Sequence, residues 1–286
     1  MMEEISFGNV KSPKDKRDFK IGKVQSPVAI PEVFMPDYSN LPTYHQSKQP
    51  ACTAHAAVWM VNYLDFHDVG MLGKLVPRMI YALSKRDDGI PNEEGTYYRQ
   101  ALKELKDYGV CSDPYFANDV SLSKEEYKDW TKIPQSAYEE GEPRKIASYV
   151  ALDTITMNSL KQAIYQNKIV LLGMYVGESF WTDKYGNVSW KASDLFPLRS
   201  PEPIVSGHAV VAIGYDKDNI YFKNSFGPTW GNNGVGHFNS SYLPYVYEAW
   251  TVMDLPDEVI KQLKQAQLSL IEKLKLLISK LLSGNK

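Results

Sequence analysis

Cysteine is scarce in this sequence and long apolar runs are missing, and both absences narrow the kinds of protein to consider. Only Cys52 and Cys111 occur among 286 residues, so at most one disulfide can form and a disulfide-stapled secreted scaffold is excluded. The first residues lack the apolar segment of a signal peptide, and no apolar run approaches the roughly 20 residues of a membrane span. We therefore expect free thiols and a reducing compartment.

A large excess of charge of one sign is absent as well. The formal net charge is -2, which gives no reason to expect a nucleic-acid partner. The two cysteines and five histidines are too scattered to supply the converging ligands of a zinc site, so we expect no metal and no other cofactor. With 43% hydrophobic and 23% charged residues, the chain can form one large domain or two packed lobes.

Helical patterns dominate the first half of the chain. The stretch after Pro50, ACTAHAAVWMVNYLDFH, has apolar residues at helical spacing and predicts a buried helix with Cys52 in its first turn. Residues 113–145 are dotted with proline and aspartate and show no clear pattern. Further helices are predicted at about 76–86, 97–108 and 158–167.

Strand patterns dominate the second half. KIVLLGMYV, HAVVAIGYD, NIYFKNS, GVGHFNSSY and YEAWTVMD are short apolar or alternating runs separated by turn residues. Helices followed by strands indicate an α+β fold and not alternating βα units. We predict an arm at 1–30, a globular region at 31–256 with lobes at about 45–150 and 151–256, and a separate segment at 257–286.

The last segment predicts an amphipathic helix. Apolar residues from Ile260 to Leu281 step by three and four positions, with Gln267 as the one polar position in the seam and lysines on the opposite face. Such a helix can form a coiled coil that makes a homo-oligomer through 257–283, or dock on its own globular region. It can also lie on a membrane surface. The heptad pattern favours the first two, and we lean toward self-association.

Cys52 is the first candidate for chemistry because of its place at the start of a predicted helix. The exposed N–H groups and the dipole of a helix N-terminus stabilise a thiolate and lower the pKa of the thiol, and a nearby imidazolium lowers it further. For an isolated cysteine, the ordinary alternative is a small buried residue that packs the helix.

Three further residues stand at spacings that suit nucleophilic catalysis. Gln46 lies shortly before Cys52, where its amide can join the Cys52 backbone N–H in binding an oxyanion. His208 heads one predicted strand and Asn224 follows the next, so both can face one cleft. His208 would accept the thiol proton, and Asn224 would orient the imidazole ring.

These stretches resemble the motifs of papain-like cysteine peptidases. HQSKQPACTAHA is similar to the family's active-site pattern Q-G-S-C-G-S-C-W-A, and GHAVVAIGYD and YFKNSFGPTWGNNGVGHF resemble its histidine and asparagine segments. EEGTYYRQALKELKDYGV resembles its substrate-binding turn and the helix that follows. The likeness covers roughly residues 30–255, and the C-T-A-x-A run and the ending LPYVYEAWTVM are typical of short bacterial and viral members.

The resemblance implies a papain-like two-lobe α+β fold, with a helical lobe, a β-barrel-like lobe and the active-site cleft between them. It implies a cysteine endopeptidase that hydrolyses protein or peptide substrates through a thioester acyl-enzyme. Because no signal peptide or transmembrane segment is seen, we expect it in the cytoplasm or associated with a virion. The residues it assigns are the catalytic Cys52, His208, Asn224 and Gln46, the substrate-binding Gly95, Thr96 and Gly207, and the supporting Phe226 and Trp230.

The sequence departs from the family pattern at several positions. His208 and Asn224 lie further beyond Cys52 than the family's usual spacing, and an insertion at 181–206 can account for this and form a flap over the cleft. The long inhibitory pro-segment of the family has no room in 1–30, so either control is by other means or the arm itself lies along the cleft. Gln49 replaces a disulfide cysteine, Thr53 and Phe226 replace tryptophans, and Thr96 replaces a glycine.

Two rival functions stay open on the sequence alone. One is a processing enzyme or acyl transferase with a single dedicated protein target. The other is a structural or binding module of a larger assembly, such as a virus particle. The presence of Gln46, Cys52, His208 and Asn224 together argues against a scaffold that has lost its catalysis.

The remaining candidates have ordinary interpretations beside their functional ones. His55 lies one helical turn after Cys52 and is an alternative base, but we predict that it packs between the lobes. Cys111 is predicted to be a small buried residue, and the pair Glu93 and Glu94 either favours basic substrates or is a solvated turn. Among the other histidines, we place His45 at the cleft edge or in a solvated loop, and His67 and His237 at the surface.

Overall fold

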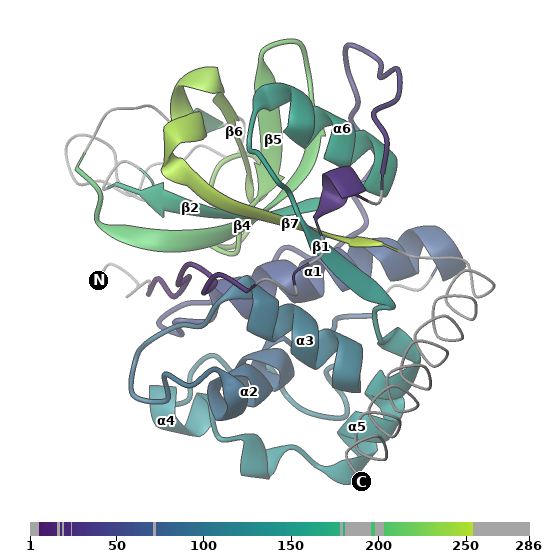
Figure 1. Ribbon diagram of the computed structural model, residues 1–286. Helices are drawn as coiled ribbons and strands as arrows, with labels where there is room; N and C mark the ends of the chain where they lie inside the picture. The colour runs from purple at the N-terminus through teal and green to yellow at the C-terminus, as the bar shows by residue number, and fades with distance from the viewer. Residues whose placement is uncertain are drawn as a thin grey trace, which may run out of the picture.

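The lobes meet along one central helix, α1 (Cys52–Val69) (Figure 1). This computed structural model describes residues 6–15, 18, 20–23, 25–70, 73–177, 180, 196–197 and 203–253. Helices form one lobe and a seven-stranded sheet forms the other. The predicted α+β class, with a helical lobe before a strand-rich lobe, is therefore confirmed.

The helical lobe is framed by α1, α2 (Pro77–Asp87) and α3 (Tyr98–Tyr108), which pack on one another. α1 is apolar on almost all sides because it also packs on strand β4 (Ser206–Tyr215) of the other lobe. Residues 113–145 add short helices that the sequence did not predict: α4 (Lys124–Tyr127), α5 (Gln135–Gly141) and the 3-10 turns Trp130–Lys132 and Glu142–Arg144.

The sheet places its strands in the order β1-β7-β2-β4-β5-β6-β3, with β4 at the centre. All neighbouring pairs are antiparallel except β3 with β6. The strands are β1 (Ser148–Ala151), β2 (Val170–Val176), β3 (Phe196–Pro197), β4, β5 (Asn219–Lys223), β6 (Val235–Asn239) and β7 (Val246–Met253). Of these, β1 and β3 were not predicted.

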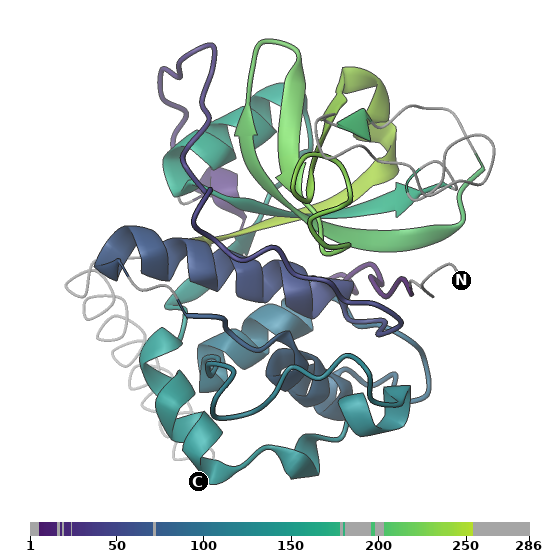
Figure 2. The same ribbon diagram turned by 180° about the vertical axis from the view of Figure 1, so that it is seen from behind.

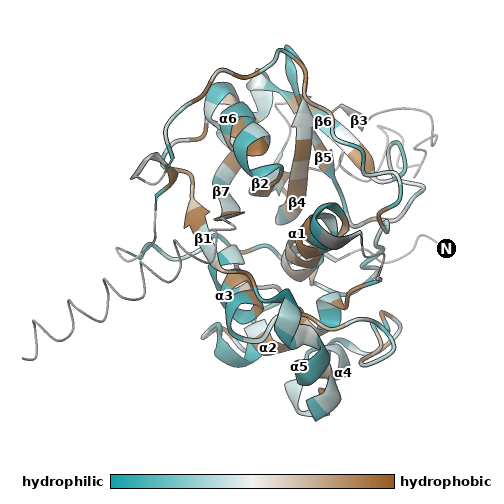
Figure 3. Cartoon of the chain, turned by 90° about the vertical axis from the view of Figure 1, so that its right-hand side faces the viewer, coloured by the Kyte–Doolittle hydropathy of each residue, from teal (hydrophilic) through white to brown (hydrophobic). Residues whose placement is uncertain are grey.

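The sheet is apolar on both faces. Helix α6 (Met157–Asn167) packs on β2, β4 and β7. The face toward the helical lobe contributes Ala209, Val211 and Ile213 to one core cluster with the side chains of α1. Figure 3 shows apolar residues concentrated on the strands and on α1, where the lobes meet. Within the described part of the chain, none of the helices combines the length and the apolar character needed to span a bilayer.

Candidate active site

Cys52 is the first residue of α1 and its side chain is buried. The residue before it, Ala51, makes no side-chain cap, so the backbone N–H groups at the start of the helix are left for another acceptor. The thiol lies against the backbone N–H of Ala209, the residue after His208, and against that of Gly8. The start of α1 thus meets the start of β4 at this thiol.

His208 and Asn224 are brought together by the pairing of β4 with β5. Nε2 of His208 lies 2.8 Å from Oδ1 of Asn224, and the same oxygen accepts the backbone N–H of Ser225 at 2.7 Å. Because this oxygen is an acceptor, Nε2 carries the ring proton. Nδ1 is buried, has no hydrogen-bond partner among the described residues and can therefore accept a proton.

Aromatic rings enclose the imidazole. The ring centroid of His208 lies 4.9 Å from that of Phe226 and 4.9 Å from that of Phe180. Trp230 donates its indole N–H to the Phe180 carbonyl at 2.7 Å, which fixes the backbone of Phe180. Phe226, which stands where the family usually has tryptophan, thus covers the His208–Asn224 bond together with Phe180.

The Gln46 side-chain amide is held in one orientation. Its Oε1 accepts the hydroxyl of Ser225, and its backbone N–H donates to the Ser225 carbonyl at 2.8 Å. The Nε2 group is therefore the end available to an oxygen, and it donates to the carbonyl of Ser6 at 2.7 Å and to that of Gln49 at 3.0 Å. Sequence reasoning missed Ser225, although it directly follows Asn224.

Residues 6–12, which we call the cleft segment, occupy the space between the lobes (Figures 1 and 2). The Thr96 backbone holds it on the helical side: Thr96 N–H donates to the Gly8 carbonyl at 2.9 Å and Thr96 C=O accepts from Val10 at 3.0 Å. On the sheet side, the Asn9 N–H donates to the Gly207 carbonyl at 3.4 Å. Of the alternatives left open by the sequence, the arm lying along the cleft is therefore the one observed.

The fit at the predicted glycines is tight. A Cβ on Gly95 would lie 2.1 Å from the Gly8 carbonyl oxygen, and one on Gly207 would lie 2.3 Å from the Asn9 carbonyl oxygen. Both contacts are with the backbone of the cleft segment itself. These two positions therefore admit a peptide backbone into the cleft only because they lack a side chain.

Phe7 places its ring among the aromatic residues that enclose His208. Its centroid lies 5.2 Å from that of His208, 5.7 Å from that of Phe226 and 6.5 Å from that of Phe180, all edge to face. Such pairs contribute about 0.5–1.5 kcal/mol each beyond the area they bury. The ring of Phe7 thus lies directly over the predicted general base.

Several polar contacts tie the cleft segment to both lobes. Asn9 donates its side-chain amide to the hydroxyl of Thr53 at 3.0 Å, so the residue that replaces tryptophan after Cys52 binds this segment. The Ser12 N–H donates to the buried carboxylate of Glu248 at 3.2 Å. Further along, Asp18 forms an ion pair with Arg99.

Burial changes the protonation expected for the catalytic pair. Burial raises the pKa of Cys52 to about 11, although the neighbouring backbone N–H groups lower it. Burial lowers the pKa of His208 to about 4, against the opposing effect of Asn224. With the cleft segment in place the pair is therefore neutral, and the expected low pKa of the thiol is not found, because desolvation outweighs the hydrogen bonds that favour the thiolate.

The remaining candidates keep their ordinary roles. His55 is buried, with Nδ1 2.9 Å from the Ala51 carbonyl oxygen, and burial lowers its pKa to about 4. Cys111 is a buried free thiol, like Cys52. Glu94 is paired with Lys124 and accepts the Ser6 hydroxyl at 3.2 Å. His45 accepts the Ser47 N–H, His67 is exposed beside Tyr63, and His237 is half-buried against Tyr221.

Two predicted features lie outside the described residues. The C-terminal helix at 257–286 is one of them. The proposed flap at 181–206 is the other, apart from β3 and residues 203–206.

Known proteins are similar in sequence to the part of the chain that forms this site. Residues 43–242 match the family model of the papain family cysteine proteases. The chain is 27% identical over 293 residues to an uncharacterized peptidase C1-like protein of Acanthamoeba polyphaga mimivirus, covering 89% of each chain. It is 24% identical to chymomexicain of Jacaratia mexicana, covering 71% of this chain and 91% of that one.

Solved structures share the fold. Xylellain, a cysteine protease from Xylella fastidiosa, aligns with a TM-score of 0.74 at 20% identity over 90% of this chain and 99% of that one. The Carica candamarcensis cysteine protease, in complex with E-64, aligns with a TM-score of 0.58 at 17% identity over 79% and 100%. The predicted two-lobe papain-like fold is therefore confirmed, and the chain belongs to the papain family of cysteine proteases.

Proposed function

We propose that this cysteine peptidase is an endopeptidase that is latent while the cleft segment is in place, with Cys52 as nucleophile and His208 as general base. One observation carries the assignment. Nε2 of His208 is held by Asn224 at 2.8 Å, while its Nδ1 is unpaired within the described structure, beside the backbone that contacts the Cys52 thiol. An imidazole held in this way can take the thiol proton.

The reaction starts when the cleft segment leaves and an extended substrate takes its place. The Cys52 thiol gives its proton to Nδ1 of His208, and the thiolate sulfur attacks the carbonyl carbon of the substrate peptide bond. The carbonyl oxygen becomes an oxyanion that accepts hydrogen bonds from Gln46 Nε2 and the Cys52 N–H. The position of the Ser6 carbonyl, 2.7 Å from Gln46 Nε2, supports this oxyanion role.

The tetrahedral intermediate then loses the leaving amine. The C–N bond breaks, His208 donates its Nδ1 proton to the departing nitrogen, and a thioester remains on Cys52. Water attacks the thioester carbonyl, with His208 accepting a proton from the water. The C–S bond breaks, the proton returns to sulfur, and the carboxylic acid product leaves. Throughout both steps, Asn224 is a positioning residue that keeps the ring in its reactive orientation.

Latency follows from what the cleft segment occupies. The Ser6 carbonyl takes the Gln46 donor, Phe7 covers His208, and Gly8 and Val10 take both hydrogen-bonding groups of Thr96. A substrate needs the same space and the same groups. The cleft segment must therefore be displaced or cut away before a substrate can bind.

Labelling with an epoxysuccinyl peptide, followed by intact mass, tests the assignment. One adduct on the wild type, absent from Cys52→Ala and strongly reduced in His208→Ala, would support an activated Cys52 thiolate. The Cys111→Ala variant is the matched control and should label like the wild type, because Cys111 is buried away from the cleft. If neither the wild type nor the Phe7→Ala variant, in which the cleft segment is loosened, labels while folded, the proposal is contradicted.

Self-association through 257–283 and residence in the cytoplasm or a virion are further proposals, supported by the heptad pattern of that segment and by the composition of the chain. If the segment assembles the protein, deletion of 257–286 lowers the mass measured by light scattering by more than the deleted residues weigh. A loss of only their mass would reject the assembly role.

A further inference from the structure

Lys85, near the end of α2, is a buried cation enclosed by one irregular turn, residues 88–96. Its Nζ donates to the backbone carbonyls of Ile90 at 2.7 Å, Glu93 at 2.9 Å and Gly95 at 2.9 Å. The carboxylate of Asp88, also buried, lies 2.9 Å from the same nitrogen. The turn is therefore folded around one ammonium group.

The turn is otherwise held by separate polar contacts: the Gly95 N–H donates to the Tyr81 hydroxyl at 3.4 Å, the Ile90 N–H to the Asp88 carboxylate at 3.0 Å, and the Tyr97 hydroxyl to the Asp88 carbonyl at 2.8 Å. It has no regular secondary structure, and Gly95 adopts φ +82, a left-handed conformation that side chains disfavour. Three of its carbonyls point toward the Lys85 ammonium, and the bond to the Gly95 carbonyl is buried. An ammonium has three donors and no acceptor, so Lys85 matches this set of oxygens, and Asp88 balances its charge.

The contact of Lys85 with the Gly95 carbonyl sets the orientation of the next residue, Thr96, which binds peptide. In a trans peptide unit, the C=O of one residue and the N–H of the next point in opposite directions. With the Gly95 carbonyl directed at Lys85, the Thr96 N–H is directed away from it, into the cleft. There it donates to the Gly8 carbonyl at 2.9 Å.

We propose that Lys85 is a positioning residue for substrate recognition: its ammonium holds the Gly95–Thr96 peptide unit so that Thr96 presents its N–H and C=O to an extended substrate backbone. The cleft segment occupies this position and shows the pairing that a substrate would make, through Gly8 and Val10. The inference rests on the proposed peptidase function and adds to it the group that organises the helical side of the cleft.

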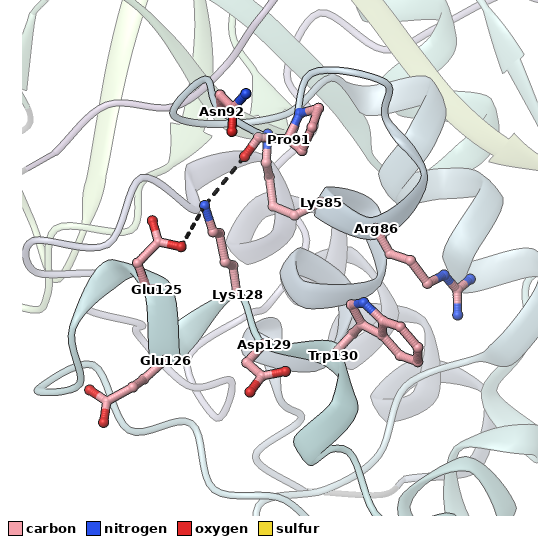
Figure 4. A pocket seen from close by; sticks show the side chains of 9 residues that line it. All are labelled: Lys85, Arg86, Pro91, Asn92, Glu125, Glu126, Lys128, Asp129 and Trp130. Atoms are coloured by element: carbon pink, nitrogen blue, oxygen red, sulfur yellow. Dashed lines mark hydrogen bonds and ion pairs between the residues drawn. The ribbon is translucent and has the colours of Figure 1, made fainter.

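The outer face of the same turn offers a matched control (Figure 4). Lys128 donates to the Pro91 carbonyl at 3.3 Å and pairs with Glu125 at 2.9 Å, on the rim of an open groove of about 630 Å³. Lys128 is thus a second lysine on this turn, but it is more exposed than Lys85 and contacts no residue that binds the cleft segment. Its removal should leave the Gly95–Thr96 unit in place.

The test compares two reagents on the full-length chain. Cys52 is labelled with an epoxysuccinyl peptide, which needs the backbone contacts of Thr96, and separately with iodoacetamide, which needs only the thiolate. Both reagents need the cleft segment to be displaced, so the ratio of the two labelling rates cancels any change in that displacement. Cys111, a buried thiol in the same lobe, reports unfolding as a second adduct.

We expect Lys85→Met to lower this ratio by about tenfold, the effect of losing roughly one backbone hydrogen bond to the peptide. Lys85→Gln, which keeps an amide donor, should lower it less, and Lys128→Met should leave it within about twofold of the wild type. Iodoacetamide labelling of Lys85→Met should become faster, since the cleft segment also depends on Thr96.

An unchanged ratio in Lys85→Met, with Cys111 still protected, would overturn the proposal. If Lys85→Met labels at Cys111, that variant has unfolded, and the ratio of labelling rates in Lys85→Gln tests the proposal instead. Unfolding of both variants would make Lys85 a residue of the lobe's core and would likewise overturn it. Failure to label Cys52 with either reagent, in Phe7→Ala as well as in the wild type, would instead contradict the peptidase assignment itself, so the two failures are distinguishable.

Discussion

The two walls of the cleft are built in different ways. On the sheet side, His208 lies on the central strand β4, and its partner Asn224 follows the neighbouring strand β5. On the helical side, Thr96 binds peptide from an irregular turn that encloses the Lys85 ammonium. Regular strand pairing places the general base and its partner, whereas a buried charge organises the backbone of Thr96, which contacts the peptide.

The two walls therefore depend on different kinds of interaction. The ladder of β4 with β2 and β5 holds His208 through many backbone hydrogen bonds, none of which depends on a particular side chain. At the turn, by contrast, three of the backbone carbonyls share one side-chain donor, the ammonium of Lys85. Changes at His208 should therefore affect chemistry, and changes at the turn should affect recognition.

The largest expected effect is at His208. In the Phe7→Ala background, His208→Ala should lower kcat by at least about 10³-fold, because it removes the general base and acid, and KM should change little. Steady-state hydrolysis of a fluorogenic peptide measures both constants. If His208→Ala instead raised KM and left kcat unchanged, His208 would act in substrate recognition and not in the chemistry, which contradicts the comparison.

The cleft segment itself gives the next effect. Phe7→Ala removes the ring that packs on His208, Phe226 and Phe180. This destabilises the seated state, in which the cleft segment is bound between the lobes, by about 1–3 kcal/mol. Labelling of Cys52 by iodoacetamide at neutral pH should accelerate about 10- to 100-fold. Val28→Ala, at an exposed position of the same N-terminal region, is the control and should change nothing. Equal rates for both variants would show that Phe7 does not hold the segment in place.

The pH dependence of labelling sharpens the view of the sheet wall. In the seated state burial raises the pKa of Cys52 to about 11, so the thiolate is scarce at neutral pH and its fraction grows about tenfold per pH unit up to that value. We expect wild-type alkylation to rise steeply between about pH 7 and 10. Phe7→Ala should already react at lower pH, because solvent and the His208 imidazolium then stabilise the thiolate. Identical profiles would show that the cleft segment does not determine the pKa of Cys52.

The smallest effect concerns the support of the helical wall. Burial raises the pKa of Glu104 on α3 from its ordinary value of 4.5 to about 7, although Gln100, Lys103 and Arg86 oppose this change. The native state therefore binds the extra proton, and the contribution of this group to stability is lost as the pH rises from about 4.5 through 7.

Glu104→Gln removes that titration. Relative to the wild type it should gain about 1–2 kcal/mol in the free energy of unfolding between pH 4.5 and 8, measured by urea denaturation. Lys103 pairs with Asp107 at 2.9 Å on the exposed side of the same helix, so Asp107→Asn, which leaves the buried carboxyl in place, serves as the control. A constant difference between Glu104→Gln and the wild type at all pH values would show that this carboxyl does not titrate in the window.

The sequence by itself determined the α+β order, most helices and strands, and the family. Apolar periodicity predicted the helix that begins at Cys52, and the alternating runs around His208 and before Asn224 predicted paired strands. These features are local, so spacing in the chain carries them. Residues 113–145 and strand β1 escaped prediction because tertiary packing, not a strong local pattern, gives them their structure.

Only the tertiary structure decided what occupies the cleft and what state the thiol is in. Nothing in the local pattern around Ser6, Phe7 and Gly8 predicts that they bind between Gln46, His208 and Thr96, because those contacts join opposite ends of the chain. The same contacts bury Cys52, and that burial raises a pKa which its helix position alone would lower. From the sequence, Lys85 is an ordinary charged residue near the end of a helix. Its contact with the Gly95 carbonyl forms only when the turn that follows folds back over it.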